Sequence, residues 1–108
     1  MKRDYFLRFA IAGFSYYEGS IAFNKLKIGK KLKLKREPRN KYDKHAVALY
    51  RKGLKLGYIP RDKNRQLSLL LKNRGVKFDA RVQKVNENEH PENQVEVILY
   101  LLTPKKES

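Results

Sequence analysis

The sequence predicts a mainly β protein of the α+β class: a small, closed or nearly closed barrel of six strands, with one main capping helix. Three observations support this prediction. Short apolar or alternating runs are separated by glycine, proline and polar turns. One stretch, near residues 62–74, has leucines at helical spacing instead. A chain of 108 residues forms one domain, whose modest core needs neither metal nor disulfide.

Two strands are predicted in the first part of the chain. Residues 5–13 form a largely buried first strand that Gly13 closes. Residues 14–24 are less regular and form a connector with room for a helical turn. Residues 30–36 alternate strictly, with leucines on one face and lysines on the other, which indicates a strand with one solvated face. Pro38 ends this second strand.

The remaining strands follow the same logic. Residues 46–50 and 54–59 are joined by a short glycine turn and form a hairpin. Residues 77–85 alternate again, and residues 94–102 form the last strand. The predicted domain therefore covers residues 1–102, and residues 103–108 form a flexible tail.

The helix is predicted over residues 62–74. Asp62 follows a proline and is a candidate N-cap, and Gly75 terminates the helix. The leucine stripe is typical of a helix that covers one end of a barrel, rather than of a cofactor site.

Lysine and arginine far outnumber the acidic residues, so the formal net charge is +15 and the pI is near 10.1. So strong a positive field favours a polyanionic partner: nucleic acid, an anionic membrane surface or an acidic protein. No apolar run is long enough to cross a membrane, so we expect no membrane partner. The alternative is that the charge only keeps the surface solvated.

The absence of cysteine excludes a disulfide framework and a thiolate metal site. The basic amino terminus is not followed by a signal-peptide core, because Arg8 and Gly13 interrupt the apolar residues. We therefore expect a cytoplasmic protein.

Three lysines, Lys31, Lys33 and Lys35, share the solvated face of the second strand. Alternate strand residues are about 6.7 Å apart, which is close to the spacing of phosphates in an extended single strand. Lysines are mobile point charges, so such a row follows a backbone without selecting a sequence. The alternative is an edge strand that lysines protect against aggregation.

The loop after this strand combines the groups that a nucleic-acid end requires. Arg36 and Arg39 supply cations for phosphate, and Tyr42 supplies a flat face for a base. Asn40 can adopt a left-handed turn and offers donors and an acceptor. Asp43 repels phosphate but accepts a hydrogen bond from a sugar hydroxyl or base amino group. Alternatively, Asp43 caps the following turn or pairs with Arg39 or Lys44.

Two further segments carry candidate binding residues. Tyr16 and Tyr17 lie between glycines, where an extended chain would direct one ring inward and the other to solvent as a stacking platform. Tyr58 and Arg61 lie where a strand ends and the helix begins, and free backbone amides there suit a phosphate. Asp62 would compete for those amides.

Enzyme signatures are weak in this sequence. His45 and His90 are far apart and neither lies in a cluster of metal ligands, so we expect no metal and no cofactor. Glu37 and Asp43 form the best acid–base pair, and a metal-dependent nuclease is the enzymatic alternative. The surrounding cations should keep both carboxyls ionised, with low pKa values.

Residues 13–19, 34–47 and 56–61 together resemble the HIRAN domain family, and the resemblance extends from about Phe6 to Leu102. Its most specific part is an acidic-Pro-x-Asn-x-Tyr-Asp pattern followed by an apolar strand. The resemblance implies a six-stranded barrel of the OB or SH3-like kind, found alone in bacteria or fused to fork-remodelling translocases and nucleases. It also implies binding of single-stranded DNA at a free 3′ end.

The resemblance assigns roles to residues of this chain. It implies that Tyr16 borders the terminal nucleotide and that Asp43 accepts from the 3′-hydroxyl or the last base. The family pattern has an arginine where Ser15 stands and an asparagine where Arg39 stands, which leaves 3′ against 5′ selectivity open. The implied end pocket and its edge comprise Asn40, Tyr42, Asp43, Tyr58 and Arg61.

The sequence therefore predicts a non-catalytic, monomeric module that binds single-stranded DNA near an end and takes any catalysis from a partner helicase or nuclease. RNA stays open as a ligand, since barrels of this kind bind both nucleic acids. The alternatives are an adaptor that docks an acidic protein and the metal-dependent nuclease.

Overall fold

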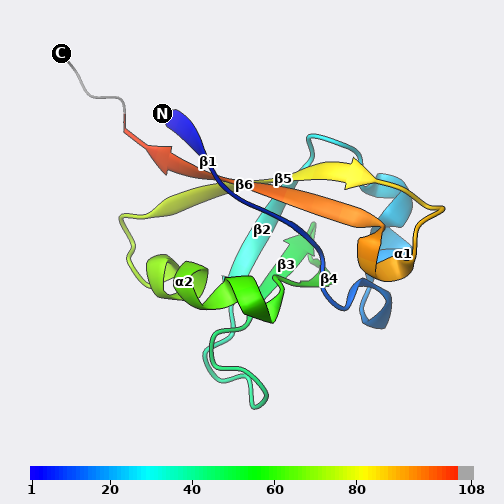
Figure 1. Ribbon diagram of the computed structural model, residues 1–108, viewed down its shortest axis with the longest axis horizontal. Helices are drawn as coiled ribbons and strands as arrows, with labels where there is room; N and C mark the ends of the chain where they lie inside the picture. The colour runs from blue at the N-terminus through cyan, green and yellow to red at the C-terminus, as the bar shows by residue number, and fades with distance from the viewer. Residues whose placement is uncertain (105–108) are drawn as a thin grey trace.

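A computed structural model of the protein describes residues 1–104 (Figure 1). The described chain forms one six-stranded sheet in the order β1-β6-β5-β2-β3-β4, in which neighbouring strands are antiparallel. The strands are β1 (Lys2–Ala10), β2 (Lys31–Arg36), β3 (Val47–Arg51), β4 (Leu54–Tyr58), β5 (Lys77–Val85) and β6 (Val95–Thr103). The helices are α1 (Gly19–Ala22) and α2 (Arg61–Leu71), with short 3-10 turns at Phe14–Tyr16, Phe23–Lys25 and Pro91–Asn93.

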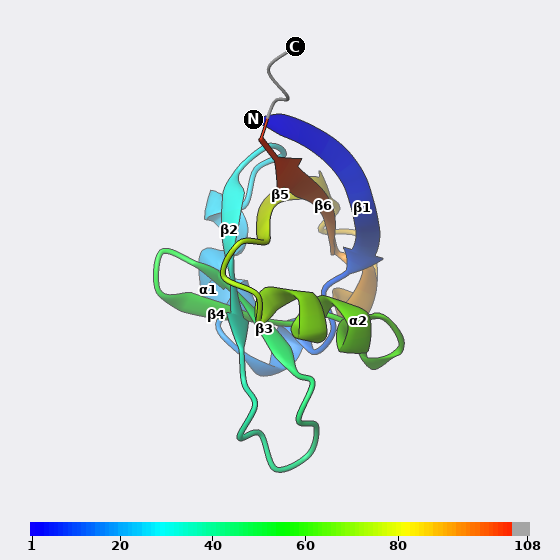
Figure 2. The same ribbon diagram turned by 90° about the vertical axis from the view of Figure 1, so that its left-hand side faces the viewer.

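The sheet curls around a central core without closing, and α2 lies across one opening (Figure 2). Strand alternation explains this core, because side chains at every second position point inward. This arrangement confirms the mainly β, OB-like fold. The core side chains that are almost completely buried include Ile11, Leu49, Leu56, Leu67 and Leu99.

The two edges of the curled sheet meet at one bridge, between Ala12, just beyond β1, and Tyr58 at the end of β4. Each residue donates its backbone amide to the carbonyl oxygen of the other, at 2.8 and 2.9 Å. Gly57 makes this approach possible: its φ is 145°, and a Cβ atom there would lie 2.4 Å from the carbonyl oxygen of Ala12. The predicted barrel is therefore nearly closed, and glycine at 57 is required where its edges touch.

Several predicted boundaries differ from the observed ones. The first strand starts earlier, at Lys2, and ends at Ala10, and Gly13 opens a 3-10 turn at a φ of 72°. Thr103, which we assigned to the tail, belongs to β6, and residues 105–108 lie outside the described residues. The strand over residues 77–85 is confirmed as predicted.

The helix also begins and ends earlier than predicted. Its N-cap is Pro60, which makes no side-chain cap, so the assignment of Asp62 as N-cap is wrong. Asp62 lies exposed in the first turn, where a negative charge still interacts favourably with the helix dipole. Leu67 is fully buried, which confirms that the leucine stripe packs into the core. No helix among the described residues is long and apolar enough to cross a membrane.

Candidate nucleic-acid interface

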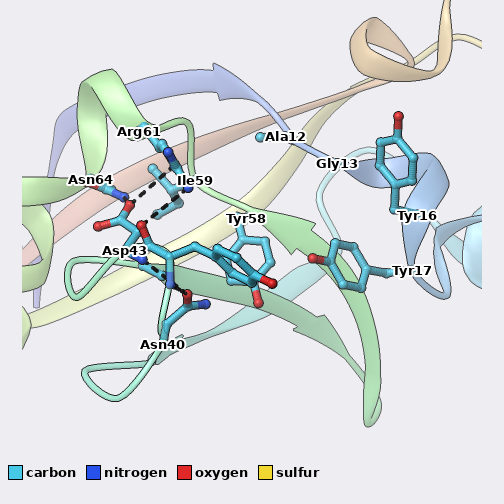
Figure 3. A pocket seen from close by; sticks show the side chains of 12 residues that line it. Ala12, Gly13, Tyr16, Tyr17, Asn40, Asp43, Tyr58, Ile59, Arg61 and Asn64 are labelled. Atoms are coloured by element: carbon cyan, nitrogen blue, oxygen red, sulfur yellow. Dashed lines mark hydrogen bonds and ion pairs between the residues drawn. The ribbon is translucent and has the colours of Figure 1, made fainter.

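A hollow of about 430 Å³ lies where the two edges of the sheet meet. Four separate segments surround it: the turn after β1, the loop between β2 and β3, the end of β4 and the start of α2. Figure 3 shows Tyr16 and Tyr17 on one side, Asp43, Arg61 and Asn64 on the other, and Tyr58 between them. The lining contains seven of the predicted site residues: Tyr16, Tyr17, Asn40, Tyr42, Asp43, Tyr58 and Arg61.

Asp43 is held in place from both sides of its carboxylate. Oδ1 accepts the backbone amide of His45 at 2.9 Å, and Oδ2 accepts the side-chain amide of Asn64 at 2.8 Å. The hydrogen bond from Asn64 is the main reason why the pKa of Asp43 lies below its ordinary value; partial burial opposes it, and the His45 amide and Arg61 reinforce it. Asp43 therefore does cap the following turn, but the expected pairing with Arg39 or Lys44 is wrong, because the cation beside the carboxylate is Arg61, 3.9 Å away.

Asn40 shapes the loop through its side chain. Its Oδ1 accepts the backbone amides of Tyr42 at 2.9 Å and Asp43 at 3.2 Å, and its Nδ2 donates to Glu37 at 3.0 Å. The left-handed turn that we expected at Asn40 is absent: within residues 1–104 Lys52 is the non-glycine residue with positive φ, at 49°. Asn40 thus positions Tyr42 and Asp43, with most of its polar capacity already used.

Glu37 joins this loop to β4. Its carboxylate accepts from the hydroxyl of Tyr58 at 2.7 Å and from Nζ of Lys55 at 3.1 Å. Burial raises the pKa of Glu37, but the hydrogen bonds from Tyr58, Asn40 and Lys55 outweigh it, so the pKa lies below its ordinary value. Burial raises the pKa of Tyr58 to about 12; the hydrogen bond with Lys55 opposes this shift and the hydrogen bond with Glu37 reinforces it. The predicted low pKa values of Glu37 and Asp43 are confirmed, although hydrogen bonds dominate over nearby charges.

Two tyrosine rings beside the hollow are open to solvent. Tyr16 is 80% exposed and Tyr42 is 79% exposed. Tyr17 is less exposed and packs edge-on against Tyr58, with ring centroids 5.5 Å apart. Tyr16 belongs to a 3-10 turn, so the extended chain that we expected there is wrong, although the two tyrosine rings do have different surroundings. The site therefore offers free aromatic faces next to an anchored aromatic pair.

Arg61 extends from the first residue of α2 over the same hollow. Its side chain is 73% exposed. Nη2 donates to the carbonyl oxygen of Tyr42 at 3.5 Å, the limit of a hydrogen bond. Such weak internal contacts leave most of the guanidinium donors available for an anion.

The other predicted residues lie elsewhere. Ser15 borders a separate hollow beside Phe14, and Arg39 is exposed in the loop. Nε of Arg36 donates to the hydroxyl of Ser68 on α2, at 3.4 Å. The three lysines of β2, Lys31, Lys33 and Lys35, are exposed outside the lining of the first hollow. The first two of them border another hollow.

Sequence reasoning missed Asn64, although it is 3% exposed and anchors Asp43. A single asparagine in a helix has no periodicity or motif that would indicate such a role. The contacts of Glu37 with Lys55 and Tyr58 were missed as well, because they join separate strands. Within residues 1–104 there is no group of three or more His, Cys, Asp or Glu residues that could hold a metal ion.

Comparisons with known proteins identify one family and two similar folds. The sequence matches the family described as HIRAN domain over residues 4–101, while no curated protein matches it. The crystal structure of a protein from Lactobacillus plantarum is similar, with a TM-score of 0.76, 24% identity, and coverage of 93% of this chain and 95% of that one. The crystal structure of the HIRAN domain of human HLTF has a TM-score of 0.64 and 22% identity, with coverage of 88% and 71%. Both structures share the fold described above.

Proposed function

Since this chain belongs to the HIRAN domain family, a family of DNA-binding domains, we propose that it is a non-catalytic module that binds single-stranded DNA. A free strand end, with the 3′ end as the resemblance implies, occupies the hollow between Tyr16 and Asp43. The chain holds the strand, and a partner helicase or nuclease supplies any chemistry. We expect it to act as a monomer in the cytoplasm, and RNA remains an alternative ligand.

One observation carries this proposal: two almost fully exposed tyrosine rings flank a hollow that also contains a fixed carboxylate and an exposed guanidinium. An exposed tyrosine loses little packing when a base stacks on it, and such stacking contributes about 1–3 kcal/mol per base. The loop hydrogen bonds from Asn40 hold Tyr42 close to Asp43 before any ligand binds. A site organised in advance loses less conformational entropy on binding.

The carboxylate of Asp43 supports a terminus that ends in a hydroxyl. Each of its oxygens already accepts one hydrogen bond, and each carboxylate oxygen can accept about two. A sugar hydroxyl or base amino group can therefore donate to it, whereas a terminal phosphate is repelled. Arg61, beside it, suits the preceding backbone phosphate.

The net charge of +15 supports strand binding in general. If about five phosphates are neutralised, the logarithm of the binding constant falls against the logarithm of salt concentration with a slope near −3.5. A slope near zero would remove the electrostatic part of the proposal.

The test is fluorescence anisotropy with labelled oligonucleotides at fixed low salt. Tyr42→Ala should weaken binding about tenfold, because it removes one stacking surface. Tyr5→Ala is the matched control, since Tyr5 is also exposed (64%) but lies on β1, outside the lining of the hollow. Equal affinity of Tyr42→Ala and the unchanged protein would favour the adaptor alternative, in which DNA is held by charge alone.

A second arm compares oligonucleotides with free and blocked ends. A phosphate on the preferred terminus should reduce affinity through repulsion by Asp43, and a phosphate on the other terminus should not. If neither end matters, the hollow does not hold a terminus. Cleavage of the oligonucleotide in magnesium or manganese would overturn the non-catalytic assignment in favour of a nuclease.

A further inference from the structure

A second hollow, of about 570 Å³, lies where β2 and β5 separate. The two strands pair only at Lys31 and Leu32, so the sheet opens beyond them. The floor of this hollow is apolar, and among the described residues that line it there is no Asp or Glu. Its cations are Lys31, Lys33, Arg51, Lys52 and Lys77.

The two hollows are connected by one face of the sheet. Lys33 lies directly opposite Tyr50, and Ala48, two residues before Tyr50 on β3, lies opposite Tyr58. Residues that are paired directly across strands share a face, so Tyr50 of the second hollow and Tyr58 of the first hollow lie on the same side. Along the strands they are separated by one step of about 7 Å.

The lysine row of β2 follows the same face. Lys35 is opposite Ala48, and its Nζ lies 6.0 Å from the centre of the Tyr50 ring. Lys31, Lys33 and Lys35 are therefore spaced at about 6.7 Å beside the tyrosines, close to the spacing of phosphates along an extended strand. The cations and the aromatic rings are arranged as in a surface that follows single-stranded nucleic acid.

Arg51 also lines the second hollow, and it follows Tyr50 directly in β3. Its Nη1 donates to the carbonyl oxygen of Lys31 at 3.0 Å, but its Nε is buried and has no hydrogen-bond partner within residues 1–104. A buried donor without a partner is energetically unfavourable.

We propose that the second hollow binds a further nucleotide of the same DNA strand whose end occupies the first hollow. The strand leaves the first hollow, crosses the outer face of β2–β3–β4 along the lysine row, and places a base against Tyr50. This inference rests on the function proposed above and extends it from a terminal pocket to a track several nucleotides long. An acidic protein segment fits the charge of the hollow but does not explain the continuous face that links it to the first one.

The experiment measures the affinity of oligothymidylates of increasing length, from about three to about twelve nucleotides. In the unchanged protein, affinity should rise at least tenfold once the strand is long enough to reach both hollows. Lys31→Gln/Lys33→Gln should reduce the salt slope for the long oligonucleotide by about 1.4, because two phosphate contacts are lost. Lys2→Gln/Lys25→Gln removes the same charge from residues outside both linings and is the control.

Tyr50→Leu separates stacking from charge. It should reduce the affinity of the long oligonucleotide about tenfold and leave that of the short one unchanged. Circular dichroism melting shows whether each variant is folded. Tyr50→Phe keeps an aromatic ring, so it should retain the affinity for the long oligonucleotide that Tyr50→Leu loses.

The outcomes separate the two proposals. If short oligonucleotides bind through Tyr42 but longer ones bind no better, or if the gain with length survives in the variants of the second hollow, the second site is refuted and the first stands. If short oligonucleotides do not bind at all, the function proposed for the first hollow fails. Binding of an acidic, aromatic peptide that Tyr50→Leu abolishes, without any gain in oligonucleotide affinity with length, would also refute the second site and assign the hollow to a protein.

Discussion

The two hollows of this domain differ in how their polar groups are held. In the first, the carboxylate of Asp43 and the hydroxyl of Tyr58 are each hydrogen-bonded to a different segment of the chain, and the side chain of Asn40 is hydrogen-bonded within its own loop. In the second, the lysines are exposed and extend from strands and turns. The first hollow is thus organised before a ligand arrives, and the second hollow is lined by mobile charges.

This difference suits the two hollows to different roles, the selection of a strand end and the retention of the strand. Fixed hydrogen-bonding groups can distinguish a hydroxyl from a phosphate, because a misplaced partner leaves a buried polar group unpaired. Mobile ammonium groups attract any phosphate and contribute affinity that depends on salt. We therefore expect the first hollow to choose the strand end and the second to hold the strand behind it.

The largest effect on the first hollow relative to the second is expected when the two edges of the sheet are separated. Gly57→Ala places a Cβ atom 2.4 Å from the carbonyl oxygen of Ala12, at a φ of 145°. The edge bridge must then shift, and we expect the free energy of unfolding to fall by about 3 kcal/mol. Urea unfolding measures this loss. The first hollow should lose its binding of strand ends, while salt-dependent binding by the lysine row persists.

Gly53→Ala is the control for backbone conformation alone. Gly53 also has a positive φ, of 82°, but no atom lies within 4 Å of the position of its Cβ. We expect a loss of about 1 kcal/mol. Equal losses at the two glycines would show that close contact at the bridge contributes little to stability.

An exchange of two residues tests whether the position of the carboxylate matters. Asp43→Asn/Asn64→Asp keeps one amide and one carboxylate within hydrogen-bonding distance, but moves the negative charge from the loop to α2. We expect discrimination between hydroxyl-ended and phosphate-ended strands to fall about tenfold, because the repelling charge is displaced. Affinity for a long strand with both ends blocked should hardly change, since the lysine row remains.

Competition anisotropy with end-modified oligonucleotides measures this exchange. Undiminished discrimination in the double variant would mean that another group selects the strand end. Loss of all binding, with a lowered melting temperature, would indicate damage to the loop, and Asp43→Glu then tests the carboxylate on its own.

A smaller effect is expected at Glu37, which connects the loop to β4. Its pKa is lower in the folded protein, so the stabilisation that it provides is present above its ordinary value of 4.5 and is lost as the pH falls through the folded pKa. Glu37→Gln should lower the free energy of unfolding by about 1 kcal/mol at neutral pH and make the acid dependence shallower.

Urea unfolding between neutral and acidic pH measures this dependence. Glu89→Gln is the matched control, because Glu89 is exposed in the loop before β6. The stability of Glu89→Gln should follow that of the unchanged protein at every pH. An unaltered acid dependence in Glu37→Gln would contradict the role of this carboxylate as a structural link.

Local pattern predicted the elements whose surroundings repeat along the chain. Residues 77–82 alternate between polar and apolar side chains, and the strand over residues 77–85 was predicted at its observed bounds. The lysine row of β2 was predicted for the same reason, since alternation by itself directs those side chains outward. The helix N-cap was predicted wrongly, because Asp62 lies one residue inside a helix that begins at Arg61.

The site was predicted in part, and its omissions have a physical cause. The sequence identified Asn40, Tyr42 and Asp43, first by the chemistry of their loop and then by the resemblance, and the structure places them beside Tyr16 and the end of β4. It gave no indication of Asn64, which reaches Asp43 across 21 positions of sequence. Such a contact depends on how α2 lies against the loop, and no local pattern carries that information.

The amino-acid sequence by itself determined the succession of strands along the chain, the faces of its strands and its positive charge, because period-two alternation and net charge are local or additive properties. The tertiary structure alone decided that the sheet edges meet at Gly57, that Asn64 and Glu37 hold the loop, and that Tyr50 and Tyr58 share one face. Each of these depends on strand register and on the curvature of the sheet, which arise only when distant segments pack together.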